Sequence, residues 1–387
     1  MRRTTRRALT NLILFGGALL LIIGFSVHGT SRKTFAWSTV KYKTTASTLP
    51  KAHGTCPGLA DADKPALVVS RVASDGDSKW VSNLADKYHI CIYDVDGSIN
   101  GDPTQLRVPA NRGHEAMAYL TFLIDNYVSI PAQGAVFVHG SRWAWHNDSP
   151  EYDNANLLAA LNTTSALAPA GYHNLRCDWS ASTCPADSQP QGSIETSLTA
   201  KLEPFNARVV SDAAIPRALA NLFGDSSSNS PASDVQPGRA DKIKSQCCAQ
   251  FAVARSNIWK HSQAEYAAVR QWLLDDGPNS APRDDRISGR ILSYVWHILF
   301  LPPRQFAPRP AAGVHEKVEL DRLNELACPS AADCYCRLYG RCGLKGCTEG
   351  SCLGQYVLPK DYTLPDDWAS THGGSVDTEH DGLKIRR

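Results

Sequence analysis

The residues best suited to chemistry lie in one short stretch. It holds two histidines, two tryptophans and a carboxylate, namely His139, Trp143, Trp145, His146 and Asp148. Indole rings stack on the apolar faces of sugars, and imidazole and carboxylate groups hydrogen-bond sugar hydroxyls. The stretch predicts a sugar-binding loop in which His139, His146 or Asp148 positions or deprotonates an acceptor hydroxyl. The alternative is a loop that packs its tryptophans into the core.

A second candidate site is the pair of carboxylates Asp94 and Asp96, which directly follows the apolar run 90–93. Two carboxylates at this spacing can hold Mn²⁺ or Mg²⁺, which would bridge the phosphates of a nucleotide-sugar. The alternative is a solvated turn, because aspartate and glycine are ordinary turn residues.

The residues Asn111, Arg112 and Glu115 stand where a helical pattern begins. Free backbone N–H groups at a helix start, together with an arginine, favour an anion such as a diphosphate. Plain helix capping is the alternative. Two further substrate-binding candidates are Arg71, which follows an apolar run, and His297, which lies on the polar face of a helical pattern over 289–300.

These residues need a sheet to bring them together. Short apolar runs of strand type cover residues 66–70, 90–93 and 135–139. Amphipathic helical patterns cover residues 78–87 and 116–127, and another carries Tyr266, Val269 and Leu273. Strands that alternate with helices predict an α/β fold with a mostly parallel sheet flanked by helices. In such a sheet the carboxyl ends of the strands share one edge, so Arg71, Asp94 and His139 should converge there.

The N-terminus predicts a membrane anchor. Arginines at positions 2, 3, 6 and 7 precede an uncharged stretch over residues 8–31, which is long enough to cross a bilayer. Arginines on this flank keep it cytosolic, so we expect a type II protein with its body in the lumen of the Golgi or endoplasmic reticulum. The predicted parts are a tail over 1–8, a signal-anchor over 9–30 and a stem over 31–64. A cleaved signal peptide is the alternative.

The cysteines fit an oxidising compartment. Six of the twelve crowd one segment, namely Cys328, Cys334, Cys336, Cys342, Cys347 and Cys352. Such clustering predicts a disulfide-stapled segment over 316–360 after an α/β domain over 65–315, with zinc as the alternative. A polar tail over 361–387 is expected to be disordered. Asn162 begins an Asn-Thr-Thr acceptor site for an N-linked glycan.

Composition excludes several classes of protein. The formal net charge is +2, so nothing in the overall balance predicts a nucleic-acid partner. The phosphate-loop, zinc-protease and nucleophile-elbow motifs do not occur in the sequence.

Several blocks of sequence resemble a known family that is found mostly in fungi. These blocks are residues 111–120, 124–127, 137–140, 145–146, 288–292, 296–300, 334–336 and 339–342. The family is catalogued as domain of unknown function 3431, and no established activity comes with the resemblance. Its layout is distantly similar to GT-A glycosyltransferases, although the strand that would end in their acid motif ends here in His139-Gly140.

Together these features lead us to expect a GT-A-like or Rossmann-like lumenal enzyme that transfers a sugar from a nucleotide-sugar to a glycan. The alternative function is a non-catalytic protein of the lumen or cell surface that binds glycans with the same aromatic loop.

Overall fold

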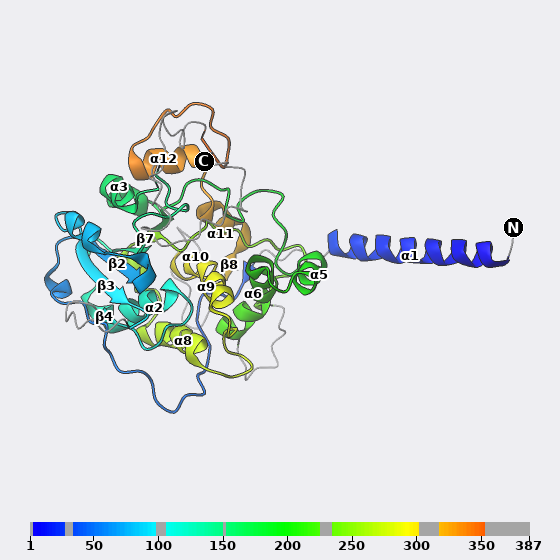
Figure 1. The fold of residues 1–387 in the computed structure, drawn as a ribbon, viewed down its shortest axis with the longest axis horizontal. Helices are drawn as coiled ribbons and strands as arrows, with labels where there is room; N and C mark the ends of the chain where they lie inside the picture. Colours follow the sequence, from blue (N-terminus) through cyan, green and yellow to red (C-terminus); the bar gives the residue numbers. More distant parts are fainter. Residues whose placement is uncertain are drawn as a thin grey trace.

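The computed structural model describes residues 3–27, 34–97, 106–149, 152–224, 234–301 and 317–352 (Figure 1). The predicted C-terminal tail over 361–387 lies outside these residues. Within them the chain forms one central sheet with helices on both faces, and the helix α1 (Arg3–Val27) extends away from this body.

The helix α1 is long and apolar enough to cross a membrane. Residues Arg6–Gly24 have a mean hydropathy of 1.8, and length and composition alone support this assignment. A signal sequence near the N-terminus has the same properties. The helix, together with the disulfides of the body, is compatible with a membrane or secretory protein, while its orientation stays a prediction.

The sheet has a parallel half and an antiparallel half. Its strands follow the order β4 (Leu106–Arg107), β3 (His89–Asp94), β2 (Ala66–Arg71), β5 (Ala135–His139), β7 (Phe251–Val253) and β6 (Tyr172–Asn174). The first four strands run parallel, whereas β7 pairs antiparallel with both β5 and β6. The three predicted strands are confirmed as β2, β3 and β5.

Both faces of the sheet are covered, which explains the continuous apolar runs in its strands. Along β2 the residues Ala66 and Val68 pack into one core cluster, while Leu67 and Val69 pack into the other. The first cluster lies under α2 (Glu115–Asp125), α6 (Ala207–Phe223), α8 (Gln263–Leu274), α9 (Asp285–Ser293), α10 (Trp296–Phe300) and α11 (Leu320–Ala327). The second lies under the 3-10 helix η3 (Lys79–Leu84), α3 (Asn154–Ala160), α4 (Thr163–Leu167) and α12 (Ala331–Tyr339).

Two helical predictions differ from the structure in their geometry. The pattern over 78–87 forms the 3-10 helix η3, and the pattern over 289–300 forms α9 and α10 instead of one helix. The two helices are separated at Tyr294 and Val295. His297, which one continuous helix would place on a polar face, is fully buried.

The segment that we expected to be an exposed stem packs against the body. Phe35 and Trp37 are fully buried and stack on each other with ring centroids 4.2 Å apart. The strand β1 (Thr34–Phe35) pairs with β8 (Val318–Glu319), and the Tyr42 hydroxyl donates to Asp275 Oδ2 at 2.8 Å. These few aromatic residues anchor a segment that otherwise has the composition of a linker.

All six cysteines of the predicted C-terminal cluster form disulfides, but the segment is not stapled only to itself. Two bonds are internal, Cys336–Cys342 and Cys347–Cys352. Two others, Cys177–Cys334 and Cys184–Cys328, tie the segment to the loop that follows β6. The helix α12 packs in the second core cluster, so this segment is part of the body. The remaining pairs are Cys56–Cys91 and Cys247–Cys248.

Candidate functional site

The carboxyl ends of β2, β3 and β5 meet at one edge of the sheet, as expected. Ser70 is in register with His139, and Arg71 is in register with Asp94. The Arg71 guanidinium lies 3.5 Å from the Asp94 carboxylate and also donates to the Gly76 carbonyl. Arg71 therefore holds the loop after β2 against the end of β3.

Asp75 lies at the centre of this edge, although the sequence analysis did not single it out. Its carboxylate accepts hydrogen bonds from the Ser141 hydroxyl at 2.7 Å and from the Val72 backbone N–H at 2.9 Å. A Cβ atom at Gly140 would lie 2.8 Å from Asp75 Oδ2 and 2.9 Å from Arg71 Cα. Only glycine at position 140 lets the two loops approach so closely. The signal in the sequence was a polar loop directly after a buried strand.

Glu115, in the first turn of α2, faces the same edge. Burial raises the pKa of the Glu115 carboxyl, His114 opposes this effect and the negative charge of Asp75 adds to it. The charge of Glu115 in turn adds to the effect of burial, which raises the pKa of Tyr119. Asp75 and Glu115 thus form a pair of neighbouring acidic groups at the strand edge, and such pairs are common at catalytic sites.

His139 and His146 form a hydrogen-bonded pair whose Nε2 atoms lie 2.8 Å apart. The Asn147 amide indicates which of them donates. Its Nδ2 donates to the Arg142 and Tyr152 carbonyls at 2.9 Å each, so its Oδ1 must face His139 Nε2, 2.9 Å away. An amide oxygen accepts, so His139 carries its proton on Nε2. That one proton is shared between the Asn147 oxygen and His146 Nε2, which is unprotonated. The Nδ1 atom of neutral His139 is then unprotonated.

The surroundings keep both imidazoles neutral. Burial lowers the pKa of His139, partly offset by the charge of Asp75 and by the Asn147 hydrogen bond. Burial lowers the pKa of His146 well below its ordinary value, and His139 and Arg176 lower it further. A neutral imidazole at physiological pH can accept a proton.

The predicted aromatic loop borders this pair. Trp145 is 44% exposed and meets His146 edge-on, with ring centroids 5.3 Å apart. The Arg176 guanidinium lies 5.5 Å from the Trp145 ring, and Arg142 lies 4.8 Å from the Trp143 ring. Trp145 is therefore partly exposed, and its stacking on a ligand stays a prediction.

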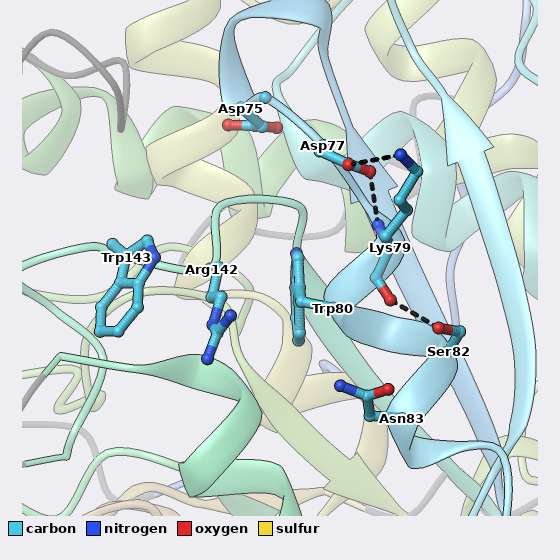
Figure 2. Close-up of a pocket in the computed structure, with 9 residues that line it drawn as sticks. Asp75, Asp77, Lys79, Trp80, Ser82, Asn83, Arg142 and Trp143 are labelled. Atoms are coloured by element: carbon cyan, nitrogen blue, oxygen red, sulfur yellow. Dashed lines mark hydrogen bonds and ion pairs between the residues drawn. The ribbon is translucent and has the colours of Figure 1, made fainter.

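A cavity of about 480 Å³ opens beside Asp75 (Figure 2). Figure 2 shows Arg142 and Trp143 on one side of it and Asp77, Lys79 and Trp80 on the other. Asp77 accepts from the Lys79 backbone N–H at 2.7 Å. The cavity thus combines indole rings with charges of both signs, and its volume is typical of a small-molecule site.

Arg112 is committed to the protein. Its guanidinium donates to the carbonyls of Leu273, Pro282 and Arg283 and lies 2.8 Å from the Asp285 carboxylate. These contacts tie the start of α2 to the connection between α8 and α9. Asn111 is exposed beside it. The guanidinium that we expected to bind a diphosphate is thus already neutralised, and we leave it out of the site.

Asp148 is also placed differently from the expectation. It is 1% exposed, and its carboxylate accepts from the Tyr335 hydroxyl at 3.0 Å and from the backbone N–H groups of Cys177 and Asp178. The sequence could not reveal this because Tyr335 is far away along the chain. Asp148 therefore joins the aromatic loop to α12 and to the chain after β6.

His297 is fully buried in α10 rather than exposed on a polar face. In the part of the chain that the structure describes, neither ring nitrogen has a hydrogen-bond partner. Burial lowers its pKa to about 3. We therefore do not assign it to substrate binding.

The two carboxylates of the predicted metal site bind protein groups. Asp94 pairs with Arg71, and Asp96 Oδ2 accepts from the Ala73 backbone N–H at 2.7 Å. Among the described residues, the group with metal-ligand spacing is Cys56, His89 and Cys91, whose two cysteines are joined in a disulfide. The arrangement of Asp94 and Asp96 stabilises the loop after β2, and we assign no Mn²⁺ or Mg²⁺ to it.

Comparison with known proteins agrees with the resemblance seen in the sequence. The model of the protein family described as "Protein of unknown function (DUF3431)" matches residues 67–337. The chain belongs to the DUF3431 family. The match spans the sheet, the histidine pair and most of α12. No curated protein and no solved structure matches the chain. The catalytic roles of His139 and His146 thus stay predictions that rest on geometry.

Proposed function

We propose that this DUF3431 protein is a glycosyltransferase-like enzyme that transfers a sugar from a nucleotide-sugar to a hydroxyl group of a glycan. The observation that carries the proposal is the fixed tautomer of His139 at the strand edge. It leaves Nδ1 without a proton, and the charge of Asp75, which also lines the cavity with the tryptophans, acts on the same imidazole.

In the proposed reaction His139 removes the proton from the acceptor hydroxyl. The acceptor oxygen then forms a bond to the anomeric carbon of the donor sugar. The bond from that carbon to the phosphate oxygen breaks, and the nucleoside diphosphate leaves with the bonding electrons. A positioned base contributes about 10²–10⁴-fold to such a reaction. His146, which is neutral and accepts from His139, holds the ring in place.

We assign the donor sugar and its phosphates to the cavity of Figure 2. Trp80 and Trp143 offer indole surfaces, and Lys79 carries positive charge, whereas Arg142 is paired with Asp153 at 2.8 Å. Lys79 is exposed, and its ion pair with Asp77 is a solvent-screened contact that a phosphate can displace. This assignment replaces Arg112 as the source of positive charge.

The proposed location is the lumen of the Golgi or endoplasmic reticulum, with α1 as a type II anchor. Two observations support it, namely an N-terminal helix of sufficient length and disulfide bonds that form in oxidising compartments.

The test is a panel of nucleotide-sugars, with and without added Mn²⁺ or Mg²⁺, screened by thermal shift on the full-length protein in detergent. We expect at least one donor to raise the melting temperature in proportion to its concentration. Lys79→Ala should remove that shift, whereas Lys64→Ala, which lies outside the cavity, should retain it. If no donor shifts the melting temperature while a glycan does, the protein is a glycan-binding module without transferase activity.

A further inference from the structure

A second cavity of about 460 Å³ lies between the loop of residues 180–189 and the helices α5 (Ile194–Leu202) and α6. Its lining is unusually rich in oxygen atoms. Serine and threonine hydroxyls from the loop and from α5 line it together with three carboxylates, those of Asp187, Glu195 and Asp212.

The hydroxyl groups face this second cavity as acceptors. A serine or threonine hydroxyl has a single proton to donate. Here five lining hydroxyls already donate this proton to backbone carbonyls, with oxygen–oxygen distances of 2.8–3.2 Å. The donors and their acceptors are Ser182 and Trp179, Thr183 and Ile243, Ser188 and Thr183, Thr196 and Pro190, and Thr199 and Glu195. Their remaining hydrogen-bonding capacity consists of lone pairs. Three of the hydroxyls already use one lone pair, since Ser182, Thr183 and Thr196 accept from the Cys184 N–H, the Ser245 N–H and the Ser193 hydroxyl.

The charged groups add to this preference. Asp212 is paired with Arg290 at 3.6 Å, so Asp187 and Glu195 are the lining carboxylates that this arginine does not offset. The single lining guanidinium, that of Arg208, donates to the Ser182 carbonyl at 3.3 Å. The cavity therefore has an excess of acceptors and of negative charge. A ligand rich in hydroxyl or ammonium groups would satisfy it, whereas a phosphate would be repelled.

Contacts between side chains link this cavity to the histidine pair. The Arg176 guanidinium donates to the hydroxyl of Ser180, a lining residue, at 2.9 Å. The same guanidinium lies 5.5 Å from the Trp145 ring, which meets the His146 ring edge-on. The second cavity is thus two side chains away from His146.

Disulfides hold the walls of the second cavity. Cys184, fully buried between the lining residues Thr183 and Pro185, is bonded to Cys328 at the end of α11. Cys177, directly after Arg176, is bonded to Cys334 of α12. A site held in this way loses little conformational entropy when a ligand binds.

We propose that the second cavity binds the acceptor of the reaction, a neutral or amino-bearing saccharide, and excludes the phosphorylated donor. The inference rests on the proposed function and assigns the donor and the acceptor to separate cavities. The donor occupies the cavity beside Asp75, and the acceptor reaches His139 past Trp145.

The test measures saccharide binding to the full-length protein in detergent by calorimetry. The saccharide probes are oligomers of glucose, of mannose, of N-acetylglucosamine and of N-acetylglucosamine that has been partly N-deacetylated. UDP and GDP are the anionic probes. Thr199→Trp places an indole in the cavity, and the matched control Leu198→Trp lies on the same helix but is 55% exposed and outside the lining. We expect Thr199→Trp to weaken saccharide binding at least about tenfold, because several hydrogen bonds are lost. Leu198→Trp should leave it unchanged.

If Thr199→Trp does not fold, a milder pair of variants tests whether the second cavity binds the saccharide. Glu195→Gln removes an exposed lining carboxylate and should weaken binding of the deacetylated oligomer more than that of neutral ones. Its control, Glu203→Gln, lies at the C-terminal end of the same helix, outside the cavity.

Two results would overturn the inference. One is unchanged saccharide affinity in Thr199→Trp or, if that variant does not fold, in Glu195→Gln. The other is the absence of binding by all four oligomers to the unaltered protein. Neither result refutes the transferase, since UDP or GDP binding that depends on Lys79 would still support it. Saccharide binding that depends on Thr199 in a protein that binds no nucleotide-sugar would instead refute the transferase and keep the saccharide site.

Discussion

The Nε2 atom of His139 lies 2.9 Å from the Oδ1 atom of Asn147, and this contact determines which nitrogen of His139 carries the proton. The Asn147 side chain cannot rotate without losing its donations to the Arg142 and Tyr152 carbonyls. Gln250 adds a further constraint, because its Nε2 donates to the same Oδ1 at 3.1 Å. The base is thus oriented by a network rooted in the neighbouring strand.

Asn147→Ala should therefore impair catalysis as well as stability. The free energy of unfolding should fall by about 1–3 kcal/mol, because two carbonyls lose their donor. The transfer rate should fall by about 10²-fold, since His139 can then adopt either tautomer. Asn206→Ala is the control, because it removes the cap of α6 at a cost of about 1 kcal/mol without touching the site. Equal loss of rate in both variants would contradict the orienting role.

The buried histidines predict a loss of stability in mild acid. Burial lowers the pKa of His297 to about 3, so the folded state stays neutral while the unfolded chain takes up a proton below pH 6.5. The unfolded state then binds more protons, and stability falls as the pH decreases from about 6.5 towards 3. At pH 5 this group alone should cost about 2 kcal/mol relative to pH 7.5.

His297→Leu should remove this part of the pH dependence, because leucine does not take up a proton. The replacement should break no hydrogen bond, since neither ring nitrogen of His297 has a partner among the described residues. Denaturant unfolding at both pH values measures the difference. His53→Gln, at an exposed position, serves as the control. An unchanged difference in the leucine variant would show that His297 can be protonated in the folded protein.

Asp148 should prove to be a stabilising residue. Asp148→Ala leaves the Tyr335 hydroxyl and two backbone N–H groups without their acceptor, which should cost about 3 kcal/mol or more. Tyr335→Phe removes one of these hydrogen bonds and should cost about 1 kcal/mol. Melting curves of both variants, with Tyr152→Phe as a control, check this order. Loss of activity at full stability in Asp148→Ala would restore its predicted catalytic role.

Asn162 is exposed and should carry a glycan if the body is lumenal. Its Oδ1 caps α4 by accepting from the Ser165 N–H at 2.9 Å, so replacing Asn162 would also destabilise the helix. Thr164→Ala removes the acceptor site and keeps the cap. Protein from a eukaryotic host should shift on a gel after glycosidase treatment, and Thr164→Ala should not. A protein that glycosidase leaves unchanged would count against the lumenal orientation.

The sequence predicted those parts of the fold that depend on local patterns. The apolar runs at β2, β3 and β5 and the apolar stripe of α2 depend only on nearby residues, and their parallel arrangement followed. Position in the sheet then brought Arg71, Asp94 and His139 to one edge. Trp145 is 44% exposed, whereas the sequence left open whether it packs into the core.

Contacts between residues far apart in the sequence could not be predicted from the sequence. Arg112 is bound by carbonyls that follow α8, and Asp148 by a tyrosine of α12, so both roles depend on residues more than 150 positions away. The burial of Phe35 and Trp37 was missed because two aromatic residues in a polar segment show no periodicity. Asp75 was missed because only the close approach of Gly140 reveals its position.

The most direct test of the central claim is the pH dependence of sugar transfer in the unaltered protein and in His139→Gln. The donor is whichever nucleotide-sugar shifts the melting temperature, and the acceptor is the oligosaccharide that binds most tightly. The unaltered protein should lose activity only when the pH falls below the pKa of His139, which burial lowers from its ordinary value. His139→Gln should be slower by about 10²–10⁴-fold, keep its affinity for the donor and show no such acidic limb. A His139→Gln protein that transfers sugar at the same rate, with the same pH profile, would contradict the account.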